Sequence, residues 1–216
     1  MDERLSGERL LHLLGLACAD MEAAQEELRQ LDARAGDGDL GVTVTLGFQA
    51  VREQLPRLAG EDIGGVLQRS GAAFNAAAAS TFGTLMATVL LRAGRAAKGM
   101  NFVGVKELAA MAAAAVDGVA ERGKASPGER TMLDAMIPAR DRLAASGEAG
   151  DTIVEALAAA ARAADEGAQS TAEMTARHGR AGWLGGQARG VPDAGAVAVA
   201  RLLGSIAVHA AEEERT

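Results

Sequence analysis

The chain has very few aromatic residues, a single cysteine and little proline. Among its 216 residues there are no tyrosines, one tryptophan and four prolines, and aromatic residues make up 2%. Because β-branched and aromatic residues favour strands, a sequence dominated by alanine and leucine instead predicts helices. The lone cysteine, Cys18, cannot form an internal disulfide. Its place in an apolar stripe indicates a small core residue in a reducing compartment.

The chain also lacks an excess of positive charge. Its formal net charge is −7, and no Lys/Arg cluster reverses this locally, which argues against a nucleic-acid partner. The start, MDERLSGERL, has neither the basic region nor the long apolar run of a signal peptide. The uncharged stretch 70–91 is long enough to span a bilayer, but its polar side chains and central Gly83 favour a buried helix–turn–helix. We therefore expect a cytoplasmic protein without a membrane partner.

Helical periodicity is the main positive signal. Apolar residues recur at spacings of three or four along an expected first helix, which Ser6 would cap and the GDGD loop would end; they are Leu10, Leu14, Ala17, Met21, Ala24, Leu28 and Leu31. Further helices are predicted over 39–54, 62–79, from STFG to 97, 101–123, from Pro127 to 145, 151–174 with Asp151 as its cap, and 193–211. We therefore predict one all-α domain over 1–216, with eight antiparallel helices in an up-down bundle or closed barrel.

The polar, glycine-rich connections would fall at one end of such a bundle. If consecutive helices alternate in direction, every second connection opens at the same end. The four connections in question contain GDGD, STFG, GKASPGERT and GRAGWLGG, whereas the others read as ordinary links. This agreement of topology with composition predicts a single functional end.

Three aspartates in LDARAGDGDLG predict a metal site at that end. Asp32, Asp37 and Asp39 would repel one another unless a cation lay between them. Carboxylate oxygens suit Mg²⁺ or Ca²⁺ rather than zinc, and the loop lacks the further oxygen ligands and the glutamate at position 12 of an EF-hand. Mg²⁺ bound by a few carboxylates usually completes its coordination with water and phosphate oxygens.

A helix expected directly after these aspartates would favour phosphate, because unpaired N–H groups and the helix dipole attract anions there. Its first turn is formed by Leu40, Gly41, Val42 and Thr43. Gly83 opens a second helix at the same end. Arg180 can neutralise a terminal phosphate, and Lys124 and Arg130 are weaker candidates. Trp183 is interpreted either as packing or as a lid residue, and the sequence does not decide between them.

Three motifs, in this order and spacing, resemble the family of dihydroxyacetone kinase L subunits, also called the DAK2 domain: LDARAGDGDLG, GKASPGERTMLDAMIPA and GRAGWLGGQARGVPDAGA. The resemblance covers essentially the whole chain. It implies an eight-helix barrel that holds ADP or ATP at one end through two Mg²⁺ ions. It also implies a separate K subunit that holds the substrate, and it leaves a homodimer open.

The resemblance implies roles for individual residues. Asp32, Asp37 and Asp39 match the magnesium ligands and, with Arg180, form the expected catalytic set. Residues 40–43 match the backbone that contacts the phosphates. Phe82 and Gly83 match a nucleotide-binding pair, and Gly123 and Met132 match two positions beside the base. Arg180 matches a nucleotide-contacting arginine. The D-P-G loop that closes over the nucleotide corresponds to Asp193, Ala194 and Gly195.

This chain departs from the family pattern at several positions. Leu40 stands where many relatives carry histidine or threonine, and Ala194 replaces the proline of D-P-G. Glu129 and Arg130 replace the usual Asp-Lys, and AAAASTFGT departs from a glycine-rich pattern. None of these changes removes a magnesium ligand.

The implied activity is transfer of a phosphoryl group from bound ATP to a short ketose, dihydroxyacetone or a similar sugar, held by the K subunit. Two donors stay open: ATP that binds, reacts and leaves, or bound ADP that the phosphohistidine of an M subunit rephosphorylates. A non-catalytic nucleotide-binding regulator or scaffold of the same fold is the alternative. A terpene-synthase-like enzyme would need an aromatic-lined cavity and a second metal motif, which this sequence lacks.

Overall fold

The computed structural model describes residues 4–178 and 190–215, and most of them are helical. The described elements, in chain order, are β1 (Leu5–Ser6), α1 (Gly7–Ala23), α2 (Gln25–Ala33), α3 (Leu40–Gln54), η1 (Leu55–Leu58), α4 (Ile63–Ala77), α5 (Thr81–Ala96), β2 (Phe102–Val103), α6 (Val105–Gly123), α7 (Leu133–Ala149), α8 (Ile153–Ser170), η2 (Thr171–Glu173) and α9 (Ala194–Glu213). The prediction of a mainly helical fold is therefore confirmed.

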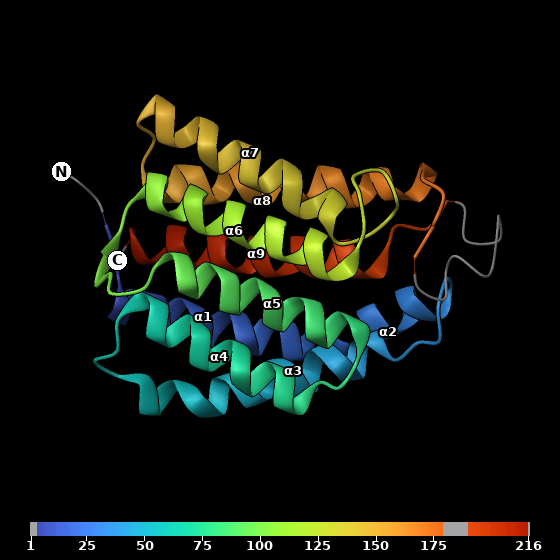
Figure 1. Cartoon of the computed structure of the whole chain (residues 1–216), viewed down its shortest axis with the longest axis horizontal. Helices are drawn as coiled ribbons and strands as arrows, with labels where there is room; N and C mark the ends of the chain where they lie inside the picture. The colour runs from blue at the N-terminus through green and yellow to red at the C-terminus, as the bar shows by residue number, and fades with distance from the viewer. Residues whose placement is uncertain (1–3, 179–189, 216) are drawn as a thin grey trace.

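The longer helices lie side by side along the long axis of the molecule (Figure 1). From α3 to α9, each helix packs against the next one in the chain. In addition, α1 packs against both α3 and α9, so that the last helix contacts the first. Glycine permits very close packing: a Cβ at Gly64 on α4 would lie 2.7 Å from the carbonyl oxygen of Gly94 on α5.

The interior is built from small and aliphatic side chains. The inward face of α1 includes Ala17, Cys18 and Met21, each at most 1% exposed. Burial raises the pKa of the Cys18 thiol to about 12, which fits an unreactive core residue. Phe48 and Phe74 form an edge-to-face pair with ring centroids 5.1 Å apart. An apolar cavity of about 230 Å³ remains between the helices.

The expected first helix is divided in the structure. It is interrupted at Ala24, whose ψ of 3° lies outside the helical range, so that α1 ends at Ala23 and α2 begins at Gln25. The described residues consequently contain nine α-helices instead of eight. Two short strands, which the sequence did not predict, pair antiparallel, with Leu5 opposite Val103.

Two other boundaries differ from the prediction because side chains bind backbone amides. The helix expected from Pro127 begins only at Leu133, since the preceding residues form a loop held by the carboxylate of Asp134. The helix α8 is capped by Thr152 and not by Asp151. The Thr152 hydroxyl accepts the Glu155 N–H at 3.2 Å, and the Glu155 carboxylate accepts the Thr152 N–H at 2.9 Å.

Figure 1 shows the polar connections at one end of the bundle. The α2–α3, α4–α5 and α6–α7 connections lie there, together with residues 171–178 that follow α8. The connections α3–α4, α5–α6 and α7–α8 lie at the opposite end, with β1 and β2. The GRAGWLGG segment lies outside the described residues.

One described helix, α9, is long and apolar enough to cross a membrane by length and composition, with a mean hydropathy of 1.6 in its most apolar window. Core helices pass the same test, and α9 packs between α8 and α1. The stretch 70–91, which was weighed as a span, is instead divided between α4 and α5, as the helix–turn–helix interpretation predicted.

Gly47 on α3 lies directly against the ring of Phe74, and a Cβ at this position would overlap that ring. Because Phe74 is fully buried, the ring can move only by disturbing the core. We expect Gly47→Ala to lower the free energy of unfolding by about 1–3 kcal/mol, measured by urea denaturation.

Gly204 on α9 provides the matched control, since a Cβ there would meet no described atom within 4 Å. Gly204→Ala should raise the free energy of unfolding by about 0.5–1 kcal/mol, because alanine restricts the unfolded chain without a clash. Equal stabilisation by both substitutions would contradict the packing described for Gly47.

Candidate functional site

The three predicted metal-binding aspartates converge between α2 and α3. Asp32 lies in the last turn of α2, Asp37 lies in the connection, and Asp39 directly precedes α3. One carboxylate oxygen of each lies within 4.8 Å of the other two. The sharp turn between them uses Gly38, whose φ of 76° lies in the left-handed region that favours glycine. The structure thus brings together side chains that are up to seven positions apart in the sequence.

Backbone groups fix the position of Asp32 within this loop. Its carboxylate accepts the Leu40 N–H at 3.3 Å, and its carbonyl oxygen accepts the N–H groups of Ala35 at 3.0 Å and Gly36 at 2.5 Å. A Cβ at Gly36 would overlap the Asp32 carboxylate, so that this approach requires glycine. The loop's own hydrogen bonds therefore orient one of the three carboxylates.

The amino end of α3 differs from those of α4, α5, α8 and α9. In those four helices the side chain of the preceding residue accepts a first-turn N–H; these residues are Asp62, Ser80, Thr152 and Asp193. In the described part of the chain, Asp39 makes no such bond to α3. Its carboxylate therefore belongs to the aspartate cluster instead of capping its own helix.

The amino end of α5, the second helix start considered for phosphate, uses the Gly83 N–H for capping. The Gly83 N–H donates to the Ser80 hydroxyl at 2.9 Å. A Cβ at Gly83 would overlap the carbonyl oxygen of Ala78, so packing alone accounts for the glycine. The amino end of α3 is consequently the better candidate for phosphate of the two.

Three residues expected around the nucleotide come together from separate helices. Phe82 lies in the first turn of α5, Met132 precedes α7, and Gly195 lies in the first turn of α9. A Cβ at Gly195 would lie 3.6 Å from Cδ2 of Phe82 and 3.8 Å from Cβ of Met132. Gly123, at the end of α6, instead lies against Leu85 of α5, at 3.6 Å by the same measure.

Asp193, two residues before Gly195, is held in place by hydrogen bonds. Its N–H donates to the Thr171 hydroxyl at 2.7 Å, and its carboxylate accepts the Ala196 N–H at 2.8 Å. Burial raises the pKa of Asp193 to about 6, and the negative charge of Asp32 adds to that rise. Asp193 therefore lies within electrostatic reach of the cluster.

The cationic side chains that were predicted to neutralise phosphate differ in where the structure places them. Arg180, expected to contact phosphate, lies outside the described residues, as does Trp183. Arg130 is 4% exposed and donates from Nη2 to the carbonyl oxygen of Val191 at 2.7 Å. Its guanidinium therefore links the α6–α7 connection to the segment that precedes α9. Lys124 follows α6 in the left-handed conformation, with φ 50°.

Sequence reasoning missed the roles of two buried residues at this end. The Asp134 carboxylate accepts the N–H groups of Gly128 at 2.5 Å and Thr131 at 2.8 Å. The fully buried Thr171 accepts the N–H of Asp193. A side chain that binds backbone amides leaves no pattern of residue types in the sequence. The only available signal was a short polar residue near a glycine-rich turn.

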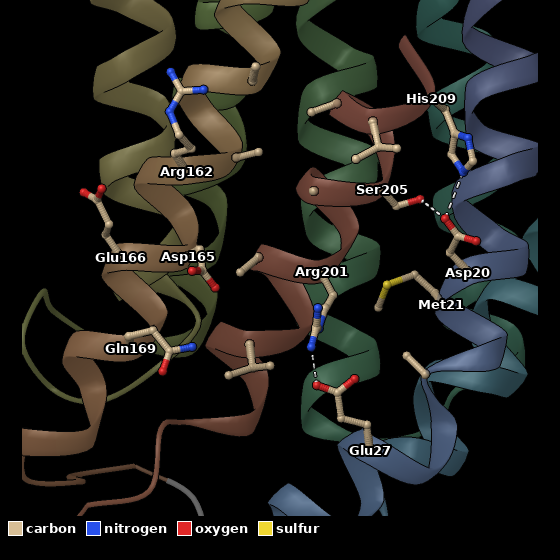
Figure 2. Close-up of a pocket in the computed structure, with 18 of the residues that line it drawn as sticks. Asp20, Met21, Glu27, Arg162, Asp165, Glu166, Gln169, Arg201, Ser205 and His209 are labelled. Atoms are coloured by element: carbon tan, nitrogen blue, oxygen red, sulfur yellow. Dashed lines mark hydrogen bonds and ion pairs between the residues drawn. The ribbon is translucent and has the colours of Figure 1, made fainter. Parts of the chain in front are cut away.

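A groove of about 1140 Å³ lies between α8, α9 and the α1–α2 side (Figure 2). Across it, Asp20 accepts the Ser205 hydroxyl at 2.6 Å and lies 2.9 Å from Nε2 of His209. Arg201 donates to Glu27 at 2.6 Å. These largely exposed pairs brace α9 against α1 and α2 and contribute little to stability. Among the described residues, none of the predicted site residues lines this groove.

Similarity to known proteins agrees with this geometry. The DAK2 domain family matches residues 34–208 of the sequence. The chain belongs to the DAK2 domain family. The ADP-binding subunit DhaL of the PEP-dependent dihydroxyacetone kinase of Escherichia coli K12 is 37% identical to this DAK2 domain over 196 residues. That match covers 90% of this chain and 93% of the relative.

Other relatives of this DAK2 domain are longer. The L-erythrulose 1-kinase of Mycolicibacterium smegmatis is 40% identical over 199 residues, which cover 89% of this chain and 33% of the relative. The crystal structure of the dihydroxyacetone kinase from C. freundii, in complex with AMP-PNP and Mg²⁺, is similar with a TM-score of 0.74 at 25% identity. It covers 97% of this chain and 35% of that chain. The DAK2 domain therefore spans nearly all of DhaL but about a third of these larger kinases.

The raised pKa of Asp193 predicts a pH dependence of stability in the metal-free chain. A carboxyl whose pKa is about 6 when folded and 3.8 in the reference state binds more protons in the folded state between those values. Its contribution to the free energy of unfolding therefore falls as the pH rises from about 4 to about 6, and is level above that range.

We expect Asp193→Asn to remove this dependence, because the amide does not titrate. Urea denaturation at intervals between pH 4 and 7 measures the difference between wild type and variant. A difference that does not change with pH would show that Asp193 has an ordinary pKa in the folded chain.

Proposed function

We propose that this DAK2 domain is the nucleotide- and magnesium-binding L subunit of a dihydroxyacetone-type kinase. In this proposal it transfers a phosphoryl group from bound ATP to a short ketose, dihydroxyacetone or a similar sugar, held by a separate K subunit. The observation that carries the proposal is the convergence of three carboxylates beside the amino end of α3. The name of the E. coli relative, an ADP-binding subunit, and the AMP-PNP and Mg²⁺ in the C. freundii structure support it.

Asp32, Asp37 and Asp39 would hold the magnesium, in two ions as the family resemblance implies. Their donor set fits the metal, because three hard oxygen ligands lie within 4.8 Å of one another and repel without a cation. When bound, Mg²⁺ neutralises negative charge on the phosphate oxygens. The bond from the Leu40 N–H keeps Asp32 oriented for this role.

The other predicted residues would position the nucleotide. The amino end of α3, residues 40–43, would contact the phosphates, with Arg180 as the expected cation. The Leu40 N–H donates to the Asp32 carboxylate and the Thr43 N–H to the Asp39 carbonyl oxygen, so the amides of Gly41 and Val42 are the ones proposed for this contact. Met132, expected beside the base, already lies next to Phe82 of the nucleotide-binding pair and Gly195 of the loop that would close over the nucleotide. Positioning and electrostatic stabilisation then provide most of the rate enhancement, as is usual in phosphoryl transfer. No side chain of this chain is assigned as a general base.

The partners and the donor belong to the same proposal. The K subunit would complete the active site from outside this chain, in the cytoplasm. The E. coli relative is named PEP-dependent, which supports testing the phosphohistidine of an M subunit as donor beside ATP. A homodimer remains a separate prediction, tested by the mass of the purified chain in solution.

A non-catalytic regulator of the same fold would bind nucleotide without transferring phosphate. The relatives named as dihydroxyacetone and erythrulose kinases favour transfer. Formation of a ketose phosphate from ATP and dihydroxyacetone, with a K subunit added, separates the two functions. Nucleotide binding without any product would favour the regulator.

Nucleotide should stabilise the chain only in the presence of magnesium. A ligand that binds the folded state alone, at a hundredfold excess over its Kd, raises the free energy of unfolding by about 3 kcal/mol. We expect the thermal midpoint to rise with ADP or ATP in Mg²⁺ and to return to the ligand-free value in EDTA. A rise that EDTA leaves unchanged would separate nucleotide binding from the aspartates.

Asp37→Ala and Asp39→Ala should each abolish this magnesium-dependent shift, because two carboxylates cannot replace the three-ligand set. Circular dichroism should show unchanged helical content, since neither side chain is part of the core. Asp165→Ala, an exposed aspartate on α8, is the control and should retain the full shift. Wild-type nucleotide affinity in both loop variants would refute the metal site.

A further inference from the structure

Arg130 combines two features that are uncommon in an arginine. Its backbone has a φ of 60°, in the left-handed region that residues other than glycine rarely adopt, and it is 4% exposed. Burial of a charged side chain is unfavourable unless hydrogen bonds and opposite charges compensate for it. A residue in both situations is held there by its surroundings, so its contacts indicate its role.

Asp134 holds the backbone on both sides of Arg130. Its buried carboxylate accepts the Gly128 N–H at 2.5 Å and the Thr131 N–H at 2.8 Å. Both bonds lie within the α6–α7 connection and the start of α7, where Gly128 also has a positive φ of 83°. The loop that contains Arg130 is therefore held by hydrogen bonds to Asp134.

The side chain of Arg130 reaches the segment that leads into α9. Its Nη2 donates to the carbonyl oxygen of Val191 at 2.7 Å, across 61 positions of sequence. Burial raises the pKa of Asp193, and the positive charge of Arg130 opposes that rise, so the two groups also interact electrostatically. Asp193 in turn binds Thr171 and Ala196. Arg130 thus joins the α6–α7 connection to the amino end of α9.

The amino end of α9 forms part of the proposed nucleotide site. Gly195, two residues after Asp193, lies beside Phe82 and Met132. If this turn moved, one side of the site would move with it, while the three metal-site aspartates, at the end of α2 and in the α2–α3 connection, would keep their places.

We propose that Arg130 is a positioning residue that holds residues 191–195 in the conformation that binds nucleotide. Its functional consequence rests on the proposed nucleotide site, whereas its contacts exist in the chain without ligand. Charge contributes as well as hydrogen bonding, because Val191 offers a carbonyl and Asp193 a carboxylate. Lysine can replace the charge, and glutamine can replace N–H donors without the charge.

The first test is amide hydrogen exchange of the metal-free chain. In Arg130→Met, we expect the amides of Asp193 and Ala196 to exchange at least tenfold faster than in wild type. The Ala156 amide of α8 should change by less than twofold. Arg130→Lys should restore most of the protection, and Arg130→Gln should not. Arg92→Met, at an exposed arginine on α5, is the matched control and should exchange like wild type.

The second test is the Kd for ADP in Mg²⁺ by calorimetry. We expect a rise of at least tenfold in Arg130→Met and Arg130→Gln, and a near wild-type value in Arg130→Lys and Arg92→Met. Weaker binding with unchanged exchange would overturn the proposal, because Arg130 would then act on the nucleotide directly. Unchanged exchange and unchanged affinity would overturn it as well.

These two measurements also separate the two proposals. If the wild-type chain binds no ADP in Mg²⁺, the proposed function fails, and the exchange data alone support or overturn the positioning role. If Arg130→Met does not fold, the comparison of Arg130→Lys with Arg130→Gln decides the same question.

Discussion

The close approach of helix backbones is the constraint on which the rest of this structure depends. With 2% aromatic residues, the helices pack largely through glycine, alanine and aliphatic side chains. A Cβ at Gly64 would lie 2.7 Å from the backbone of α5. A Cβ at Gly167 on α8 would overlap the carbonyl oxygen of Asp134 on α7. Such contacts hold neighbouring helices close together, so that the alternate connections at one end of the bundle lie near one another, and the candidate site is assembled from those connections.

Much of the fold and the centre of the site could be predicted from the sequence, because they depend on local patterns. The apolar stripe that includes Ala17 and Met21 marked the buried face of α1, and both side chains are buried. The aspartates of GDGD lie so close in sequence that one tight turn brings them together. Alternation of helix direction then predicted the α4–α5 connection at the same end as the α2–α3 connection, where Figure 1 shows both.

The remaining features depend on contacts that residue types do not reveal. The break at Ala24 occurs in a stretch whose apolar periodicity continues across it, so the sequence predicted one helix. Asp134 and Thr171 act on backbone amides of distant or irregular segments, which no spacing rule describes. Gly83 was expected to open a helix that favours phosphate, but its N–H donates to the Ser80 hydroxyl. In each of these cases a hydrogen bond or a backbone angle determined the local structure, and the hydrophobic pattern of the sequence did not reveal it.

The break at Ala24 makes α2 a short helix with its own stability. This nine-residue helix has one fully buried side chain among the described residues, Leu28. Helices with so little buried surface open locally at a lower free energy than the long helices around them. Asp32 is carried by this least anchored helix, while Asp39 precedes the well-buried α3. A cation bound by both aspartates would therefore link the end of α2 to the start of α3. The local folding of α2 and the binding of the cation would then be thermodynamically coupled.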